Sequence, residues 1–327
     1  MNTENINKKS FNELKKRNYV SSILCFIILI LTNCNSHKEP DFSTSPNDVP
    51  DGILMVHILK NGLDADFFHG TSTKPQKVII MLGGSEGGRM WSYQPQLIHD
   101  LIDQGFCILS LPYFGTDNLP KNLKGIPIEY FKSALKWLST QNDLVIPSDY
   151  ALLGVSRGAE LALLLGSRFP EIKAIVAIAP SSVVFPGPPT SLFKALGKQH
   201  SAWSENGQEL PFVHVPFTFT TLKGMITGNR TRMFEKALQD TVSVKLASIP
   251  VEKTQGPVLI VSFLRDQVWP SKLMSEQIRK RLMDNNFHFF YEHETYDGTH
   301  SEWSIETCRE NILKFLRERF LYSESIK

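Results

Sequence analysis

Short apolar segments alternate with longer amphipathic segments along most of this chain, and this pattern restricts the possible folds more than any other feature. The apolar segments have the length of buried strands, whereas the segments between them repeat their apolar residues at helical spacing. Parallel strands joined by crossover helices produce this alternation. The sequence therefore predicts an α/β fold with a mostly parallel central sheet and helices on both faces.

The expected elements begin with a hairpin around Asn61-Gly62, which is a strong turn pair. Strands are expected over residues 53–59, 65–68, 78–82, 106–111, 150–155, 174–179, 258–263 and 287–292. Helices are expected over residues 94–104, 128–140, 157–168, 272–283 and 305–320. With 327 residues, 42% of them apolar, the chain can bury the core of one large α/β domain, which we place at residues 52–327.

One long segment, residues 181–254, interrupts the alternation. Its periodicity weakens, and proline, glycine and aromatic residues accumulate in it. A loop of this length without secondary structure is uncommon inside a compact domain. We therefore predict an inserted lid that contains some helix, such as residues 232–238.

The N-terminal residues have the pattern of a targeting segment. A basic cluster precedes an uncharged apolar run, Ile23 to Leu31, which is too short to cross a bilayer as a helix. The run ends in Leu31-Thr32-Asn33-Cys34, which resembles a bacterial lipoprotein box in which Cys34 is lipidated. We expect a signal over residues 1–33, a flexible tether over residues 34–51, and a protein exported to the bacterial cell envelope and anchored to its membrane. An uncleaved signal anchor is the alternative.

Composition argues against several classes of partner. The formal net charge is +2 and the basic residues of the body are dispersed, so nucleic acid is not expected as a partner. The histidines and cysteines lack metal-ligand spacing, and we expect no metal and no cofactor. Cys107 lies in an apolar strand segment and Cys308 in a helical one, so two separate buried thiols are expected.

The segment Gly154-Val155-Ser156-Arg157-Gly158 has the spacing of a nucleophile elbow between a strand and a helix. Such a turn holds the serine in a strained backbone conformation, and the flanking residues must be small because neighbouring chains approach closely. Ser156 is therefore the candidate nucleophile. The alternative is an ordinary helix-capping serine. Glu160, one helical turn further, is expected to be a structural hydrogen-bonding group.

A second segment, Gly83-Gly84-Ser85-Glu86-Gly87, matches the same pattern. Too few strands precede it for an elbow, but its place after an early strand suits the loop that donates an oxyanion-hole amide. We assign the backbone N–H groups of Ser85 and Arg157 to the oxyanion hole. Removing one such donor costs on the order of 3 kcal/mol of transition-state stabilisation.

An acid and a histidine follow the serine in the order that this mechanism requires. Asp266 comes after the strand expected over residues 258–263, and His300 comes after the strand expected over 287–292. Ser, Asp and His in this order are typical of serine enzymes with the α/β-hydrolase fold. His293, Asp240 and Asp297 fit less well by position.

Residues 153–163, with the sequence LGVSRGAELAL, resemble the elbow of the acyl-CoA thioester hydrolase and bile acid-CoA:amino acid N-acyltransferase family. The similarity covers roughly Val78 to Phe320 and implies the α/β-hydrolase fold, the triad Ser156, Asp266 and His300, and acyl-CoA as substrate. Four further stretches resemble the catalytic domain of that family: Leu111–Gly115, Ile126–Phe131, Ile249–Lys253 and Asp266–Ser271.

Two departures from the family bear on function. Animal members carry an N-terminal β-sandwich domain, for which the residues ahead of the first glycine loop leave too little room. Members that transfer acyl groups to amino acids use a cysteine nucleophile, whereas this chain has Ser156, which favours hydrolysis.

The sequence thus predicts hydrolysis of acyl thioesters or esters. Export conflicts with a coenzyme A substrate, because acyl-CoA is not expected outside the cytoplasm. The alternatives are an exported carboxylesterase or lipase-like enzyme, an N-acyltransferase, and an inactive lipid-anchored binding protein.

Overall fold

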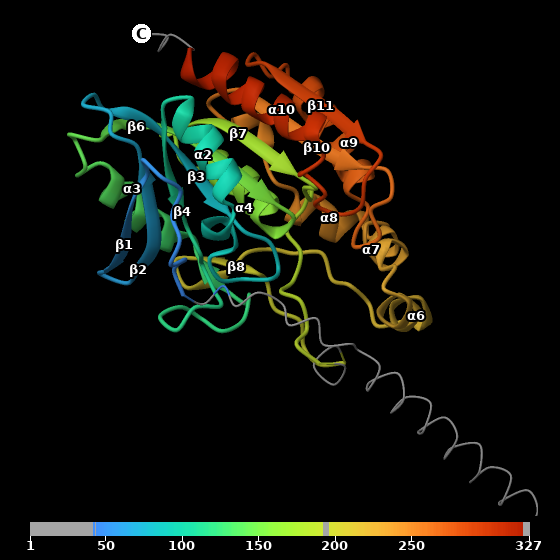
Figure 1. The fold of residues 1–327 in the computed structure, drawn as a ribbon. Helices are drawn as coiled ribbons and strands as arrows, with labels where there is room; N and C mark the ends of the chain where they lie inside the picture. Colours follow the sequence, from blue (N-terminus) through green and yellow to red (C-terminus); the bar gives the residue numbers. More distant parts are fainter. Residues whose placement is uncertain (1–41, 43, 192–195, 323–327) are drawn as a thin grey trace, which may run out of the picture. The chain divides into compact units, whose positions relative to one another are not determined.

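A sheet of eight strands forms the centre of the part of the chain that the structure describes (Figure 1). The computed structural model describes residue 42, residues 44–191 and residues 196–322, and all of them belong to one compact unit, Phe42–Lys327. Along the sheet the strands are β1 (Leu54–Lys60), β2 (Leu63–His69), β4 (Phe106–Ser110), β3 (Gln76–Leu82), β6 (Val145–Val155), β7 (Ile172–Ile178), β10 (Val258–Phe263) and β11 (Tyr291–Tyr296). Only the β1–β2 and β2–β4 pairs are antiparallel.

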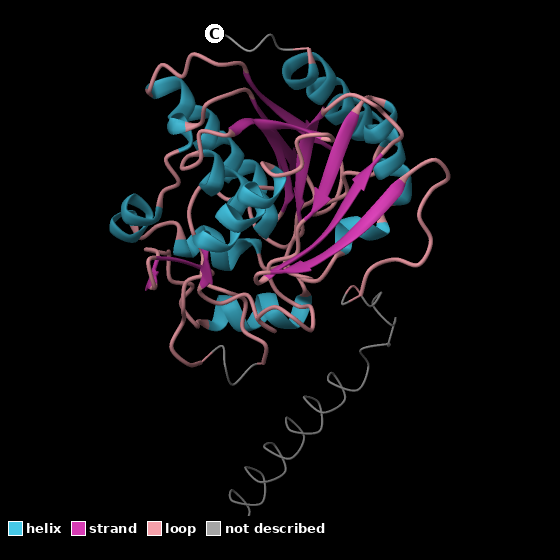
Figure 2. Cartoon of the chain, turned by 90° about the vertical axis from the view of Figure 1, so that its left-hand side faces the viewer, coloured by secondary structure: helices cyan, strands magenta, loops and turns pink. Residues whose placement is uncertain are grey.

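Helices cover both faces of this sheet, as the sequence predicts (Figure 2). Side chains of α3 (Ile128–Leu138), α4 (Arg157–Gly166) and α9 (Ser271–Asp284) join the core on one face. Side chains of α2 (Pro95–Asp103) and α10 (Glu306–Phe315) join the core on the other face. A π-helical stretch, Leu316–Leu321, extends α10.

The predicted hairpin is confirmed. Asn61 and Gly62 connect β1 to β2 with φ of 55° and 77°, and two left-handed residues give a turn whose twist matches that of the paired strands.

The last predicted strand, residues 287–292, is wrong in its position, because β11 spans Tyr291–Tyr296. β11 is an edge strand that pairs only with β10, and its side chains are half-buried or exposed. An edge strand needs no continuous apolar run, so the apolar residues just before it gave a misleading signal. His293 consequently lies within the strand.

The described part of the segment over residues 181–254 contains two short strands and three short helices, and its apolar side chains form a small core together with Trp269 and Met274. The helix predicted at residues 232–238 is confirmed as α7. The elements are β8 (Trp203–Glu205), β9 (Gln208–Glu209), α6 (Phe219–Thr227), α7 (Thr231–Ala237) and α8 (Thr241–Ala247), and β8 pairs with the short strand β5 (Ile126–Pro127). The described residues also include 3-10 turns at Met90–Tyr93 and Val251–Lys253.

The two described cysteines are separate buried thiols, as predicted. Cys107 lies in β4 and Cys308 in α10, and both are free. Burial raises the pKa of each thiol to about 12, so both stay protonated.

The predicted signal over residues 1–33 and the lipidation site Cys34 lie outside the described residues. Among the helices that are described, none combines the length and the apolar character that crossing a bilayer demands.

Candidate active site

Ser156 lies on the sharp turn between β6 and α4. Its φ is 55° and its ψ is −114°, which is the strained backbone expected of an elbow. A Cβ on Gly154 would overlap the Gly158 carbonyl, and one on Gly158 would overlap the Leu82 carbonyl, so both glycines are sterically required. The Ser156 side chain makes no capping bond to α4, which argues against the helix-capping interpretation.

The structure brings Ser156, His300 and Asp266 into one hydrogen-bonded row. His300 Nε2 lies 2.8 Å from Ser156 Oγ, and His300 Nδ1 lies 2.8 Å from Asp266 Oδ2. Asp266 is in the loop after β10 and His300 is in the loop after β11, both at the carboxyl edge of the sheet. The Ser156 residue is 7% exposed, and the side chains of His300 and Asp266 are 14% and 3% exposed, so the row is largely buried.

The loop after β10 holds the Asp266 carboxylate in a fixed orientation. The backbone N–H groups of Val268 and Trp269 donate to Oδ1 over 2.9 and 3.2 Å, and the Ser271 hydroxyl donates to Oδ2 over 2.5 Å. These donors leave Oδ2 directed at His300. Ser271 was not predicted as a site residue from the sequence, although it ends the Asp266–Ser271 stretch that resembles the family's catalytic domain.

Trp269 connects this row to the segment over residues 181–254. Its indole is buried, donates to the Ala179 carbonyl over 3.0 Å, and lies edge-on to the His300 ring at 5.9 Å between centroids. Phe185 and Phe234 of that segment pack against the same indole. The packing of the inserted segment therefore bears directly on the position of His300.

The rival titratable residues lie in other environments. His293 is hydrogen-bonded to Ser262 Oγ at 2.8 Å, Asp240 caps α8, and Asp297 is an exposed partner of Arg265. Within the described residues, no group of three or more metal-binding side chains comes together.

The second glycine-rich loop, Gly83–Gly87, lies directly beside the elbow. β3 and β6 are parallel neighbours in which Leu82 is paired with Gly154, so both loops leave the same edge of the sheet. A Cβ placed on Gly84 would lie 3.3 Å from Ser156 Cβ. The loop thus borders Ser156 as predicted, while the Ser85 side chain is exposed.

Two hydrogen bonds shape this loop. The Gly84 N–H donates to Glu86 Oε1 over 2.5 Å, and the Tyr113 hydroxyl donates to the Gly83 carbonyl over 2.5 Å. Burial, and secondarily the nearby Glu86 charge, raises the pKa of Tyr113 well above its usual value. Tyr113 therefore stays a donor at any physiological pH.

The Arg157 side chain belongs to a buried ion pair with Glu160. It donates to Glu160 Oε2 over 2.8 Å and to the Pro186 carbonyl over 2.6 Å. Glu160 also accepts from Trp203 Nε1 over 2.7 Å, which confirms its structural role. Burial raises the pKa of Glu160, against the opposing effect of Arg157.

A cavity of about 600 Å³ is lined in part by Arg157, the residue that follows Ser156 in the elbow. Apolar side chains such as Met225, Met233 and Phe234 line it, and its described lining contains no Asp or Glu. Its described lining also contains four lysine and arginine residues: Lys124, Arg157, Lys198 and Arg230. The volume suits a small-molecule site, although Ser156, His300 and Asp266 are not in its described lining.

Solved structures with a similar arrangement define the class of fold. An esterase of Pyrococcus furiosus matches with a TM-score of 0.50 and 17% identity over 85% of this chain and all of that chain. A puromycin-hydrolyzing peptidase of Mycobacterium tuberculosis matches with a TM-score of 0.54 and 16% identity over 80% of this chain and 38% of that chain. The fold is the α/β-hydrolase fold, as predicted.

The family follows from the sequence comparison. The model described as "BAAT / Acyl-CoA thioester hydrolase C terminal" matches residues 126–300, and the chain belongs to this family. Mouse acyl-coenzyme A thioesterase 1 is 29% identical over 231 residues, which are 71% of this chain and 50% of that protein. Mouse peroxisomal succinyl-coenzyme A thioesterase is 26% identical over 243 residues, again 71% of this chain and 50% of that protein. The chain spans about half the length of these curated relatives.

Proposed function

We propose that this protein hydrolyses acyl thioesters or esters with Ser156 as nucleophile, His300 as base and Asp266 as orienting acid. The observation that carries this proposal is the continuous hydrogen-bonded row from Ser156 Oγ through the imidazole to Asp266, set on a strained elbow. Membership of a family whose described relatives include acyl-CoA thioesterases supports the reaction class.

The proton positions follow from the chemistry of the partners. A carboxylate can only accept a hydrogen bond, so His300 Nδ1 carries the proton toward Asp266 and Nε2 is the free base. The Ser156 hydroxyl then donates to Nε2 and loses its proton as Oγ attacks the substrate carbonyl. The imidazolium protonates the leaving thiolate or alkoxide, and water repeats the cycle on the acyl-enzyme.

The oxyanion of the tetrahedral intermediate needs amide donors beside Ser156. We assign the N–H of Arg157, which begins α4, and the N–H of Ser85, in the loop that borders the elbow. Both are backbone groups, so their role depends on loop position and is independent of the Ser85 side chain.

The cavity that Arg157 helps to line is a candidate site for the non-reacting part of the substrate. Its apolar wall suits an acyl chain, and its basic side chains suit an anionic group. Arg157 is already paired with Glu160, which leaves Lys124, Lys198 and Arg230 for a substrate anion.

The deciding experiment measures turnover of palmitoyl-CoA and of p-nitrophenyl esters beside labelling by a fluorophosphonate probe. We expect labelling and turnover of at least one substrate class in the wild type, and neither in Ser156→Ala. Labelling without turnover would overturn the substrate assignment. Absence of both would favour a binding protein, and capture of the acyl group by amine acceptors in competition with water would favour an N-acyltransferase.

The location of the protein bears on which leaving group it meets. We propose export and acylation at Cys34, supported by the lipoprotein-like sequence ahead of the domain. An exported enzyme would act on esters other than coenzyme A thioesters. Incorporation of a labelled fatty acid in the wild type but not in Cys34→Ser would support this proposal, and equal incorporation would contradict it.

A further inference from the structure

The residues just before β1 lie on the loop that follows β3. We name Phe42 and residues 44–50 the strap. The Arg89 N–H donates to the Phe42 carbonyl over 2.7 Å. A Cβ on Gly88 would lie 2.5 Å from this carbonyl oxygen, and Gly88 has a φ of +62°, so the close approach requires glycine. The strap is therefore packed against the end of the loop that begins at Gly83.

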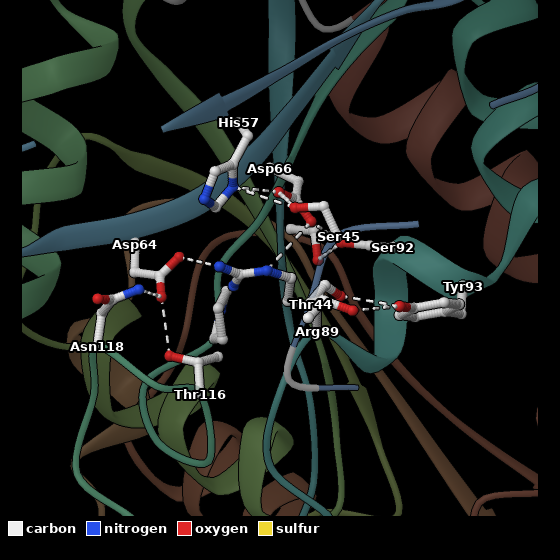
Figure 3. A network of polar contacts seen from close by, with 12 residues as sticks. Thr44, Ser45, His57, Asp64, Asp66, Arg89, Ser92, Tyr93, Thr116 and Asn118 are labelled. Atoms are coloured by element: carbon white, nitrogen blue, oxygen red, sulfur yellow. Dashed lines mark hydrogen bonds and ion pairs between the residues drawn. The ribbon is translucent and has the colours of Figure 1, made fainter. Parts of the chain in front are cut away.

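Arg89 fixes this end of the loop to a buried ionic cluster (Figure 3). Its guanidinium forms an ion pair with Asp64, and its Nε lies 3.7 Å from Asp66 Oδ2. Arg89 is 2% exposed and both aspartates are 0% exposed. Separating a buried pair leaves a charge without compensation, so Arg89 has little freedom to move.

The strap contacts the same cluster through side chains (Figure 3). Ser45 Oγ donates to Asp66 Oδ1 over 2.7 Å. The Tyr93 hydroxyl donates to the Thr44 carbonyl over 2.9 Å, and the Phe42 and Tyr93 rings lie 5.4 Å apart. Several independent contacts thus hold the strap against the turn that contains Arg89.

The other end of this loop borders Ser156 through Gly84. Few residues separate Gly84 from Arg89. Among them Gly87, with a φ of +70°, is packed closely against the Phe114 ring. The strap and the amide groups beside the serine therefore lie at opposite ends of one closely packed loop.

We propose that the strap positions the loop after β3, which begins at Gly83 and carries the proposed oxyanion donor Ser85 N–H. The strap acts through Arg89 and the Asp64–Asp66 cluster. This inference rests on the proposed function, because the loop matters to rate only if an oxyanion forms at Ser156. Misplacement of a donor acts on the transition state more than on ground-state binding.

The test compares full-length variants in the strap. The double variant Phe42→Ala/Ser45→Ala removes a ring contact and the hydrogen bond to Asp66, and it leaves the Arg89–Asp64 ion pair in place. We expect kcat and the rate of fluorophosphonate labelling to fall about tenfold, with KM within about threefold of wild type. The single variant Ser45→Thr keeps both the hydroxyl and the Phe42 ring, and its kcat should equal that of the wild type. Asn47→Ala, at an exposed position of the same strap, is the matched control.

The possible outcomes distinguish failure of the positioning role from failure of the proposed hydrolase function. A wild type that neither turns over an ester nor takes the label overturns both. A wild type that is active, with a double variant whose kcat equals that of Asn47→Ala, overturns the positioning role, even if the double variant unfolds at a lower temperature. A rise in KM with unchanged kcat overturns it as well.

Discussion

Two neighbouring loops of this protein share one five-residue pattern, Gly-x-Ser-x-Gly, and differ in nearly every other respect. In the elbow, Ser156 is 7% exposed, and its two glycines are packed against backbone. In the loop after β3, Ser85 is exposed, and Gly83 and Gly87 face the side chains of Glu86 and Phe114. The pattern specifies a tight turn, and the partners that each turn meets determine its role.

The difference arises from where each loop leaves the sheet. β3 and β6 are adjacent parallel strands whose ends, Leu82 and Gly154, are paired, so both loops leave the sheet at the same place. Only the elbow has an imidazole within hydrogen-bonding distance of its serine, because the loops after β10 and β11 converge there. The other loop offers backbone N–H groups instead.

The largest difference between the two loops is expected when each serine is replaced by alanine. Ser156→Ala should lower kcat by about 10³-fold or more, because the nucleophile is lost. Ser85→Ala should leave kcat within about twofold, since the proposed donor is a backbone N–H. Steady-state ester hydrolysis measures both. Similar losses in the two variants would contradict the assignment.

One carboxylate beside each loop, Asp266 near the elbow and Glu86 in the loop after β3, can be replaced by its neutral amide. Asp266→Asn should lower kcat by about 10³-fold to 10⁴-fold, because an amide no longer fixes the His300 tautomer. Glu86→Gln keeps an oxygen acceptor for the Gly84 N–H and should change kcat by less than about fivefold. Stopped-flow or steady-state kinetics would check the pair. A larger loss in Glu86→Gln than in Asp266→Asn would reverse the roles of the two loops.

The glycines should differ in their effect on stability. Gly158→Ala places a Cβ into the Leu82 carbonyl, and we expect a loss of about 3 kcal/mol or more in the free energy of unfolding. Gly83→Ala places a Cβ 3.2 Å from Glu86 Oε1, at the end of a flexible side chain, and should cost about 1 kcal/mol or less. Urea unfolding followed by fluorescence distinguishes them. Equal losses would show that the elbow is no more tightly packed than its neighbour.

A modest effect is expected at Tyr113, whose hydroxyl supports the loop after β3. Tyr113→Phe removes the donor to the Gly83 carbonyl and should cost about 1 kcal/mol of stability with a severalfold loss of kcat. Because burial raises its pKa far above the assay range, the wild-type pH–rate profile should contain no ionisation that Tyr113→Phe abolishes. Disappearance of such a step in the variant would show that Tyr113 takes part in proton transfer.

The sequence predicted what is carried by local pattern and element order. The Asn61-Gly62 hairpin, the parallel strands and the elbow all have short-range signals, and Asp266 and His300 were selected as candidates from their order after strands. β11 was misplaced because an edge strand carries no apolar run.

The support around the site could not be predicted, because it depends on contacts between distant residues. Trp269 against His300, Ser271 on Asp266, and Arg89 between two buried aspartates are set by packing across loops. Asp64 and Asp66, two residues apart in a strand and so on one face, were the only local hint of the ionic cluster.

The most direct test of the central claim is to locate the fluorophosphonate adduct on the intact protein by peptide mass spectrometry. We expect one adduct per chain, on the peptide that contains Ser156, formed at a rate that falls when His300 is replaced. An adduct on the peptide that contains Ser85, or active enzyme that never carries an adduct at Ser156, would contradict it.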